Sequence, residues 1–210
     1  MTTEFILELE KAIHFNKPGR SAQMLMSRFG RSTAEPGQAR LASVLILLFL
    51  KNHETHFVLT KRTSTYPEDK HSGQISFPGG SKDPSDEDLQ TTAIRETFEE
   101  IGVNADKIKI IGQLSDLYIP VSNFQVHPFV GYSSDIGGYK LQPNEVEEIL
   151  EIPISMLLED EYIKSKDIAI HNGMVLKDVP YFDFFGYTVW GATAMILSEF
   201  REVVKIIQAK

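Results

Sequence analysis

The chain has 210 residues, of which 42% are hydrophobic and 24% are charged, with 14 glycines and 10 prolines. This composition is that of a globular protein and excludes disordered, collagen-like and mucin-like chains. Because the sequence contains no cysteine, it has no disulfide, no thiolate metal site and no catalytic thiol. The 29 acidic and 21 basic residues give a net charge of −8, which disfavours sequence-independent binding to nucleic acid or to an anionic membrane.

The longest apolar run, residues 41–50, is interrupted only by Ser43 and has half of the roughly 20 residues that a membrane-spanning helix needs. We therefore expect a buried strand there and no membrane association. The N-terminus carries acidic residues within its apolar stretch and lacks a small-residue cleavage site, which argues against a signal peptide. A cytoplasmic location fits these features.

Hydrophobic periodicity and turn residues predict a series of helices and strands along the chain. The predicted helices are one or two short ones in the first 30 residues, 84–101, a short one at most at 154–158, and 191–210. The predicted strands are 41–51, 56–61, 107–117, 124–132, 146–152 and two or three short ones within 167–187, turned at Asn172 and Gly173. The predicted loops are 30–40, a hairpin turn at 52–54 and a polar loop at 63–76.

The simplest organisation is a single α/β domain, because the sequence shows no internal repeat, low-complexity tract or linker. Within it we expect an N-terminal helical extension over residues 1–35 and a main domain over residues 36–210. The extension and the strand 41–51 are candidate surfaces for a homodimer.

Three glutamates share one face at the end of the predicted helix 84–101. Glu96, Glu99 and Glu100 stand at i, i+3 and i+4, within an arc of about 100°, and residues 93, 94, 97, 98 and 101 occupy the opposite, packed arc. Exposed carbonyls make a helix C-terminus negative, and like charges at this spacing repel. A hard divalent cation such as Mg²⁺ or Mn²⁺ would cancel that repulsion, and a solvated acidic face is the alternative.

Capping and turn-forming residues lie on both sides of this helix. Ser85 and Asp88 are candidate caps at its start, and Gly102 stands where a left-handed terminator belongs. Gly79 and Gly80 precede the helix, and paired glycines let the backbone bring a carbonyl or amides close to a metal and to phosphates.

Together these residues resemble the signature of the Nudix hydrolases, G-x5-E-x7-R-E-U-x-E-E-x-G-U, in which U is aliphatic. The matching residues are Arg95, Glu96, Glu99, Glu100, Gly102 and Val103. Glu87 lies seven intervening residues before Arg95, although six residues, not five, separate it from Gly80. Thr97 stands where the signature has an aliphatic residue.

The spacing is similar to that of the coenzyme A pyrophosphatase-like branch, where G-G-x-x-D-P-x-D precedes the helix, as residues 79–86 do here. Further segments also look like those found in members of that branch, namely residues 59–60, 71–80, 120–122, 128–131 and 190–194. The resemblance implies an α/β/α sandwich with a mixed β-sheet and a catalytic helix that follows a glycine-rich loop. It also implies cleavage of coenzyme A into 4′-phosphopantetheine and adenosine 3′,5′-bisphosphate.

The resemblance further implies roles for individual residues. Glu96, Glu99, Glu100 and the Gly79 carbonyl would bind Mg²⁺ or Mn²⁺, and Arg95 would orient a glutamate through a bidentate pair. The metals would activate a water that attacks one phosphorus.

The general base has several candidates. It is Glu99, Glu100 or a carboxylate among Glu145, Glu147 and Glu148, of which we favour Glu145. The alternative for that cluster is a solvated loop edge.

Substrate contacts are less specific. Lys61, Arg62, Lys70 and His71 are candidates for contacting a coenzyme A 3′-phosphate, and Gly80 for approaching the diphosphate; for the basic residues a solubilising role is the alternative. Trp190 and residues 182–185 would stack an adenine or pack in the core.

Two other functions remain open. The substrate could be ADP-ribose, another nucleoside diphosphate derivative or a damaged nucleotide, or the protein could be a Nudix-fold sensor that binds a nucleotide without hydrolysing it. If the substrate is an anionic diphosphate, the acidic chain predicts strict dependence on a divalent cation.

Overall fold

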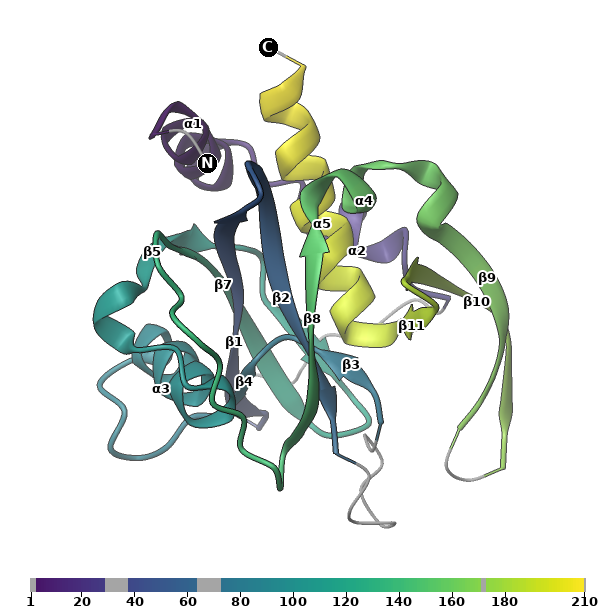
Figure 1. Cartoon of the computed structure of the whole chain (residues 1–210). Helices are drawn as coiled ribbons and strands as arrows, with labels where there is room; N and C mark the ends of the chain where they lie inside the picture. Colours follow the sequence, from purple (N-terminus) through teal and green to yellow (C-terminus); the bar gives the residue numbers. More distant parts are fainter. Residues whose placement is uncertain (1–2, 29–37, 64–72, 171–172, 210) are drawn as a thin grey trace.

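The computed structural model describes residues 3–28, 38–63, 73–170 and 173–209. The helices are α1 (Thr3–Phe15), α2 (Arg20–Met24), α3 (Leu89–Ile101), α4 (Ile154–Leu158), α5 (Gly191–Gln208) and the 3-10 turns η1 (Ala105–Lys107) and η2 (Asp160–Tyr162) (Figure 1). The strands are β1 (Arg40–Lys51), β2 (Glu54–Arg62), β3 (Ile75–Ser76), β4 (Gly79–Ser81), β5 (Lys109–Gln113), β6 (Leu117–Ile119), β7 (Phe124–Ser133), β8 (Val146–Pro153), β9 (Ile163–Ala169), β10 (Val175–Phe184) and β11 (Tyr187–Val189).

The main sheet is mixed. Its strands run in the order β3-β2-β1-β7-β5, with β4 paired to β1, β6 to β7 and β8 to β2. The β1–β7 pair is parallel, whereas β1 is antiparallel to β2 and to β4. Asn52 and His53 join β1 to β2 with φ angles of 50° and 64°, so the predicted hairpin turn is confirmed.

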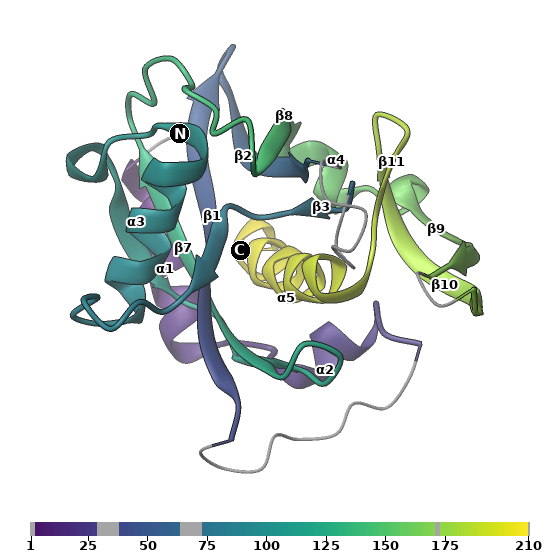
Figure 2. The same cartoon turned by 90° about the horizontal axis from the view of Figure 1, so that it is seen from below.

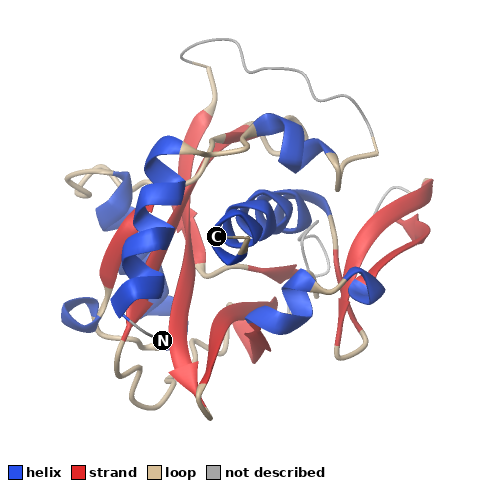
Figure 3. Ribbon diagram, turned by 90° about the horizontal axis from the view of Figure 1, so that it is seen from above, coloured by secondary structure: helices blue, strands red, loops and turns tan. Residues whose placement is uncertain are grey.

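Both faces of β1 are covered, which explains why its sequence is almost continuously apolar. Side chains alternate along a strand, so Leu45 and Leu47 pack in one cluster with Ala93 of α3, and Ile46 packs in another with Phe200 of α5. Figure 2 shows α3 and α5 on opposite sides of the sheet, and Figure 3 shows the helix that ends at the C-terminus from the opposite direction. The predicted α/β/α sandwich with a mixed sheet is confirmed.

A second sheet of three strands, in the order β11-β10-β9, stands beside α5 as an arm at the right of Figure 1. The prediction of two or three strands in residues 167–187 is confirmed, although β9 already begins at Ile163. Gly173 has a φ of 77° at the predicted turn, and Asn172 lies outside the described residues.

Helix α1 packs against α5 and β5, with Leu9 and Ile13 almost fully buried. A Cβ added to Gly112 of β5 would lie 2.9 Å from Ile13 Cγ2, so this strand approaches the helix closely at a glycine. The division of the chain at residue 35 stays a prediction. In the described part of the chain, no helix combines the length and apolar character that crossing a membrane requires.

The structure corrects three predicted elements. The helix predicted from residue 84 begins at Leu89, because the Asp88 carboxylate accepts a 2.7 Å hydrogen bond from the Thr91 N–H. Ser85 is not its cap, since the Ser85 hydroxyl donates to Asp83 at 2.6 Å. The strand predicted at 107–117 is divided between η1, β5 and the start of β6.

The glycine-rich segment is also not a loop. Gly79 and Gly80 form strand β4, paired with Val44 and Ser43 of β1, and the predicted polar loop 63–76 ends in strand β3. The glycines are therefore fixed to the central strand of the sheet.

Candidate active site

Strand β4 can lie against β1 and α3 only because its first two residues are glycines. Gly79 has a φ of 150°, and a Cβ there would lie 2.3 Å from the Ser43 carbonyl oxygen. A Cβ on Gly80 would lie 2.6 Å from the carboxyl carbon of Glu96. The backbone of β4 thus approaches the acidic face of α3 closely.

Helix α3 ends where the sequence predicts. Gly102 adopts the left-handed conformation with a φ of 77°, and its N–H donates to the Phe98 carbonyl at 2.9 Å. Ala93, Thr97 and Ile101 are buried on the packed side, as expected. Phe98 was also expected on the packed side, but half of its surface is exposed. The buried stripe of α3 is therefore narrower than the predicted packed arc of residues 93, 94, 97, 98 and 101.

The three glutamates of α3 occupy different environments. Glu99 is the most open, with 52% of its side chain exposed, and Glu96 has 15% exposed. Glu100 is buried at 3% exposure, and one of its oxygens accepts a long hydrogen bond of 3.3 Å from the Gly79 N–H. The face is therefore not a uniformly solvated acidic surface.

Burial sets the pKa of two of these carboxyls. It raises the pKa of Glu100 to about 8, against the opposing charge of Arg62. Burial also raises the pKa of Glu96, and Arg95 partly offsets this effect. Both carboxyls lie beside the two glycines of β4, and burial disfavours their charged forms. Such carboxyls are typical of a site that binds a cation.

Arg95 makes the predicted bidentate pair, but with a different acid. Its Nε and Nη2 donate to the two oxygens of Asp86 at 2.8 and 2.9 Å. Its Nη1 lies 2.9 Å from an oxygen of Glu96 and 2.9 Å from an oxygen of Glu99. Arg95 therefore joins a buried aspartate to the glutamate face.

Asp86, and not Glu87, takes the position of the first acid of the signature. Asp86 is 6% exposed and also accepts hydrogen bonds from the Asp83 N–H and the Thr92 hydroxyl, whereas Glu87 is exposed. Sequence reasoning missed Asp86, although five residues separate it from Gly80, as the signature requires. With Asp86 in this position, the one residue by which the chain exceeds the signature lies between Asp86 and Arg95.

The donor chemistry fits a hard divalent cation. Glu96, Glu99 and Glu100 offer carboxylate oxygens beside the glycine backbone, and oxygen is the ligand that Mg²⁺ prefers. Among the described residues, no three acidic or histidine side chains already converge on one point. Instead Arg95 Nη1 bridges Glu96 and Glu99, so positive charge already lies between two of the acids.

The acidic cluster at the start of β8 contributes unequally. Glu145 is exposed, and its charge helps to raise the pKa of both Glu96 and Glu100, which places it near the α3 acids. Glu147 forms an ion pair with Lys61 at 2.6 Å, and Glu148 accepts a 2.7 Å hydrogen bond from the Tyr187 hydroxyl. Only Glu145 thus stays a candidate base in this cluster.

The two predicted substrate contacts in β2, Lys61 and Arg62, have different surroundings, because successive side chains of a strand point to opposite faces of the sheet. Arg62 is close enough for its charge to lower the pKa of Glu100, whereas the neighbouring Lys61 is held by Glu147. Lys70 and His71 lie outside the described residues. Trp190 is partly exposed just before α5, and it is not part of the core.

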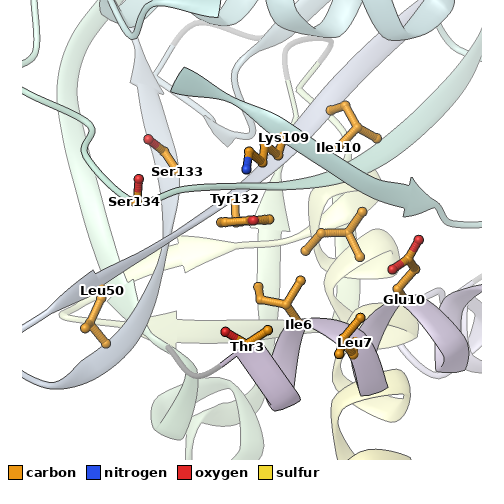
Figure 4. Close-up of a pocket in the computed structure, with 11 residues that line it drawn as sticks. Thr3, Ile6, Leu7, Glu10, Leu50, Lys109, Ile110, Tyr132, Ser133 and Ser134 are labelled. Atoms are coloured by element: carbon orange, nitrogen blue, oxygen red, sulfur yellow. The ribbon is translucent and has the colours of Figure 1, made fainter. Parts of the chain in front are cut away.

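A hollow of about 450 Å³ lies at the other end of β1, between α1 and strands β5 and β7 (Figure 4). Leu7, Leu50 and Tyr132 are among its lining residues, and none of the predicted site residues is. Because β4 pairs with residues 42–44 near the start of β1, this hollow is separate from the glutamate face.

Comparisons with known proteins identify the family. The NUDIX domain model matches residues 39–172. The uncharacterized Nudix hydrolase NudL of Yersinia enterocolitica is 33% identical over 195 residues, which cover 91% of this chain and 97% of that protein. Nudix hydrolase 22, chloroplastic, of Arabidopsis thaliana is 35% identical over 170 residues, which cover 78% of this chain and 55% of that longer protein.

Solved structures agree on the fold. The Nudix hydrolase RenU of M. Smegmatis has a TM-score of 0.55 at 14% identity, over 80% of this chain and 88% of that one. The MutT protein of Methanosarcina mazei has a TM-score of 0.51 at 16% identity, over 84% of this chain and 100% of that one. Since the matched family segment covers more than half of the chain and includes both β4 and α3, the chain belongs to the Nudix hydrolase family, hydrolases that act on pyrophosphate bonds.

Proposed function

We propose that this Nudix hydrolase cleaves the diphosphate of coenzyme A or its derivatives, giving 4′-phosphopantetheine and adenosine 3′,5′-bisphosphate. The observation that supports a diphosphate site best is the approach of β4 to α3, with the Gly80 backbone against Glu96 and the Gly79 N–H on Glu100. Backbone amides and carboxylates at one point are suited to phosphate oxygens with a cation between them.

Nudix hydrolases generally use divalent metals such as Mg²⁺ or Mn²⁺. We propose that Glu96, Glu99, Glu100 and the Gly79 carbonyl hold the metal here. When bound, it would lower the pKa of a water and neutralise charge on the diphosphate oxygens. This arrangement would let a protein of net charge −8 accept an anionic substrate.

The other site residues hold this constellation. Asp86 fixes two nitrogens of Arg95, so that the third nitrogen holds oxygens of Glu96 and Glu99. We propose a positioning role for both residues, because neither needs to touch the substrate to act in this way. For the general base we favour Glu145, with Glu99 and Glu100 as alternatives.

Coenzyme A is favoured over other diphosphates by the residues that resemble its branch, including the Gly79–Asp86 spacing and the segment 190–194. ADP-ribose, another nucleoside diphosphate derivative or a damaged nucleotide is the alternative substrate class. A sensor without turnover is disfavoured, since all three glutamates of the signature are present. A cytoplasmic location and a homodimer stay predictions.

The test is a substrate panel with product identification. The protein is incubated with coenzyme A, an acyl derivative and ADP-ribose, each with Mg²⁺ or Mn²⁺, in ¹⁸O water. Mass spectrometry should find ¹⁸O in one of the two expected coenzyme A products, which also identifies the phosphorus attacked. Cleavage of ADP-ribose without cleavage of coenzyme A would select the alternative, and binding without cleavage of any compound would select the sensor.

A further inference from the structure

A cavity of about 460 Å³ lies between the main sheet and the three-stranded sheet, and none of the predicted site residues except Trp190 lines it. One wall is the backbone around Gln74 and Ile75, at β3. The other wall is formed by β9 and β11 and includes Lys166, Tyr187 and Trp190. A volume of this size is within the range of small-molecule sites.

The cavity is connected to the candidate active site through β2 and β3. Ile75 pairs with Lys61, and the Arg62 N–H donates to the Gln74 carbonyl at 3.0 Å. Four residues after Ile75, the chain reaches Gly79. In Figure 2, β3 lies between β1 and β11, and β11 contacts β3. A ligand with one end at the glycines could therefore extend along β3 into the cavity.

Elements around the cavity hold its two walls together. The Thr193 hydroxyl, in the first turn of α5, donates to the Ile75 carbonyl at 3.0 Å, three residues after Trp190. The Tyr187 hydroxyl donates to Glu148 of β8 at 2.7 Å. The Tyr187 hydrogen bond thus joins the second sheet to the main sheet, and the Thr193 hydrogen bond joins β3 to the start of α5, so that the cavity is preformed.

The lining combines a cation with aromatic rings. Lys166 Nζ lies 2.6 Å from the Thr188 hydroxyl and 4.9 Å from the ring centroid of Tyr181, and among the described residues it forms no ion pair with a carboxylate. The nearby lysines differ, because Lys164 is paired with Asp183 and Lys177 with Asp167. A cavity lined by a lysine, a hydroxyl and a tryptophan suits an aromatic base that carries a phosphate.

We propose that this cavity binds the phosphorylated adenosine end of the substrate, with Trp190 against the purine and Lys166 at the 3′-phosphate. The assignment rests on the proposed function, because coenzyme A carries that phosphate and ADP-ribose does not. Lys166 would then be the residue that distinguishes the two substrate classes, in place of the basic residues at positions 61, 62, 70 and 71 that the sequence suggested for the 3′-phosphate.

Trp190 allows a direct binding test, because it is the one tryptophan in the sequence. Its fluorescence is titrated with adenosine 3′,5′-bisphosphate and with adenosine 5′-monophosphate, without metal. The bisphosphate should bind about tenfold to a hundredfold more tightly, which is the effect of one charge-assisted contact. Equal affinities, or no fluorescence change with either probe, would overturn the proposal.

Lys166→Met removes the charge but keeps most of the aliphatic stem, and Lys164→Met is the matched control on the same strand. The first variant should abolish the preference for the bisphosphate, and the control should keep it. In hydrolysis, Lys166→Met should lower kcat/KM for coenzyme A about tenfold or more and leave that for dephospho-coenzyme A unchanged. An equal loss for both substrates would overturn the proposal and leave the proposed function intact.

The two proposals can also fail in the opposite way. If wild-type protein does not cleave coenzyme A but still prefers the bisphosphate through Lys166, the proposed function is wrong and the cavity assignment stands. Calorimetry with Trp190→Leu supplies a second variant, which should weaken binding of both nucleotides by a similar factor. Unchanged binding in this variant would contradict the stacking role.

Discussion

Asp86→Asn should lower the free energy of unfolding by about 3 kcal/mol at pH 7, because every partner of the Asp86 carboxylate is a donor. Arg95 provides two of the hydrogen bonds, and the Asp83 N–H and the Thr92 hydroxyl provide the others. An amide must place its NH₂ group against at least one of these donors. Hydrogen bonds to charged groups contribute about 1.5–3 kcal/mol each, and the part of Arg95 that stays exposed limits the total.

The loss should depend on pH with a definite sign. Arg95 holds the pKa of Asp86 well below its usual range. A lowered pKa contributes stability that is present above the unfolded value of about 4 and is lost as the pH falls further. The difference between wild type and Asp86→Asn should therefore shrink when urea denaturation is repeated below pH 4.

Glu87→Gln is the matched control, since it changes the adjacent, exposed acid in the same way and should cost less than about 0.5 kcal/mol. Turnover should fall only in the Asp86 variant, because Arg95 would no longer be held against Glu96 and Glu99. A cost below about 1 kcal/mol for Asp86→Asn, or an equal cost for the two variants, would refute the assignment of Asp86 as the partner of Arg95.

Three further variants test the glutamate face. Burial raises the pKa of Glu100 to about 8, so ionising this carboxyl destabilises the folded wild-type protein as the pH rises. In urea denaturation with EDTA present, the free energy of unfolding of Glu100→Gln should therefore increase by about 2 kcal/mol relative to wild type between pH 6 and pH 8. A difference between the two proteins that stays constant over this pH range would contradict the assignment. Gly80→Ala would place a Cβ 2.6 Å from the Glu96 carboxylate, so the Mg²⁺ concentration for half-maximal activity should rise at least about tenfold; an unchanged value would argue against the metal role of Glu96. Glu99→Gln should abolish turnover and change stability by less than about 0.5 kcal/mol, since Glu99 is half exposed, and an undiminished rate would exclude it as a metal ligand.

Local rules predicted the features of the site that depend on nearby residues. The end of α3 follows from Gly102, which alone sets the left-handed conformation there. The i, i+3 and i+4 spacing of the glutamates is fixed by the helix itself. Strands β1 and β2 were also predictable, because their sequences are apolar on both faces.

The remaining features depend on contacts between distant segments. The burial of Glu100 is produced partly by Gly79, 21 positions away, and could not be read from the pattern of α3. The choice of Asp86 over its neighbour is made by Thr92 and Arg95 after the helix has formed. The ion pair that holds Lys61 requires β8 to lie beside β2.

The parallel pairing of β1 with β7 has a consequence for how the protein acquires its activity. The ladder joins Ser43 to His127, residues 84 positions apart, and β1 must be in place before β4 can pair with it. Contacts between such distant residues form slowly during folding, because a long loop must close first. Refolding protein should therefore gain helical structure early and hydrolytic activity late, when the last segment of chain reaches the centre of the sheet.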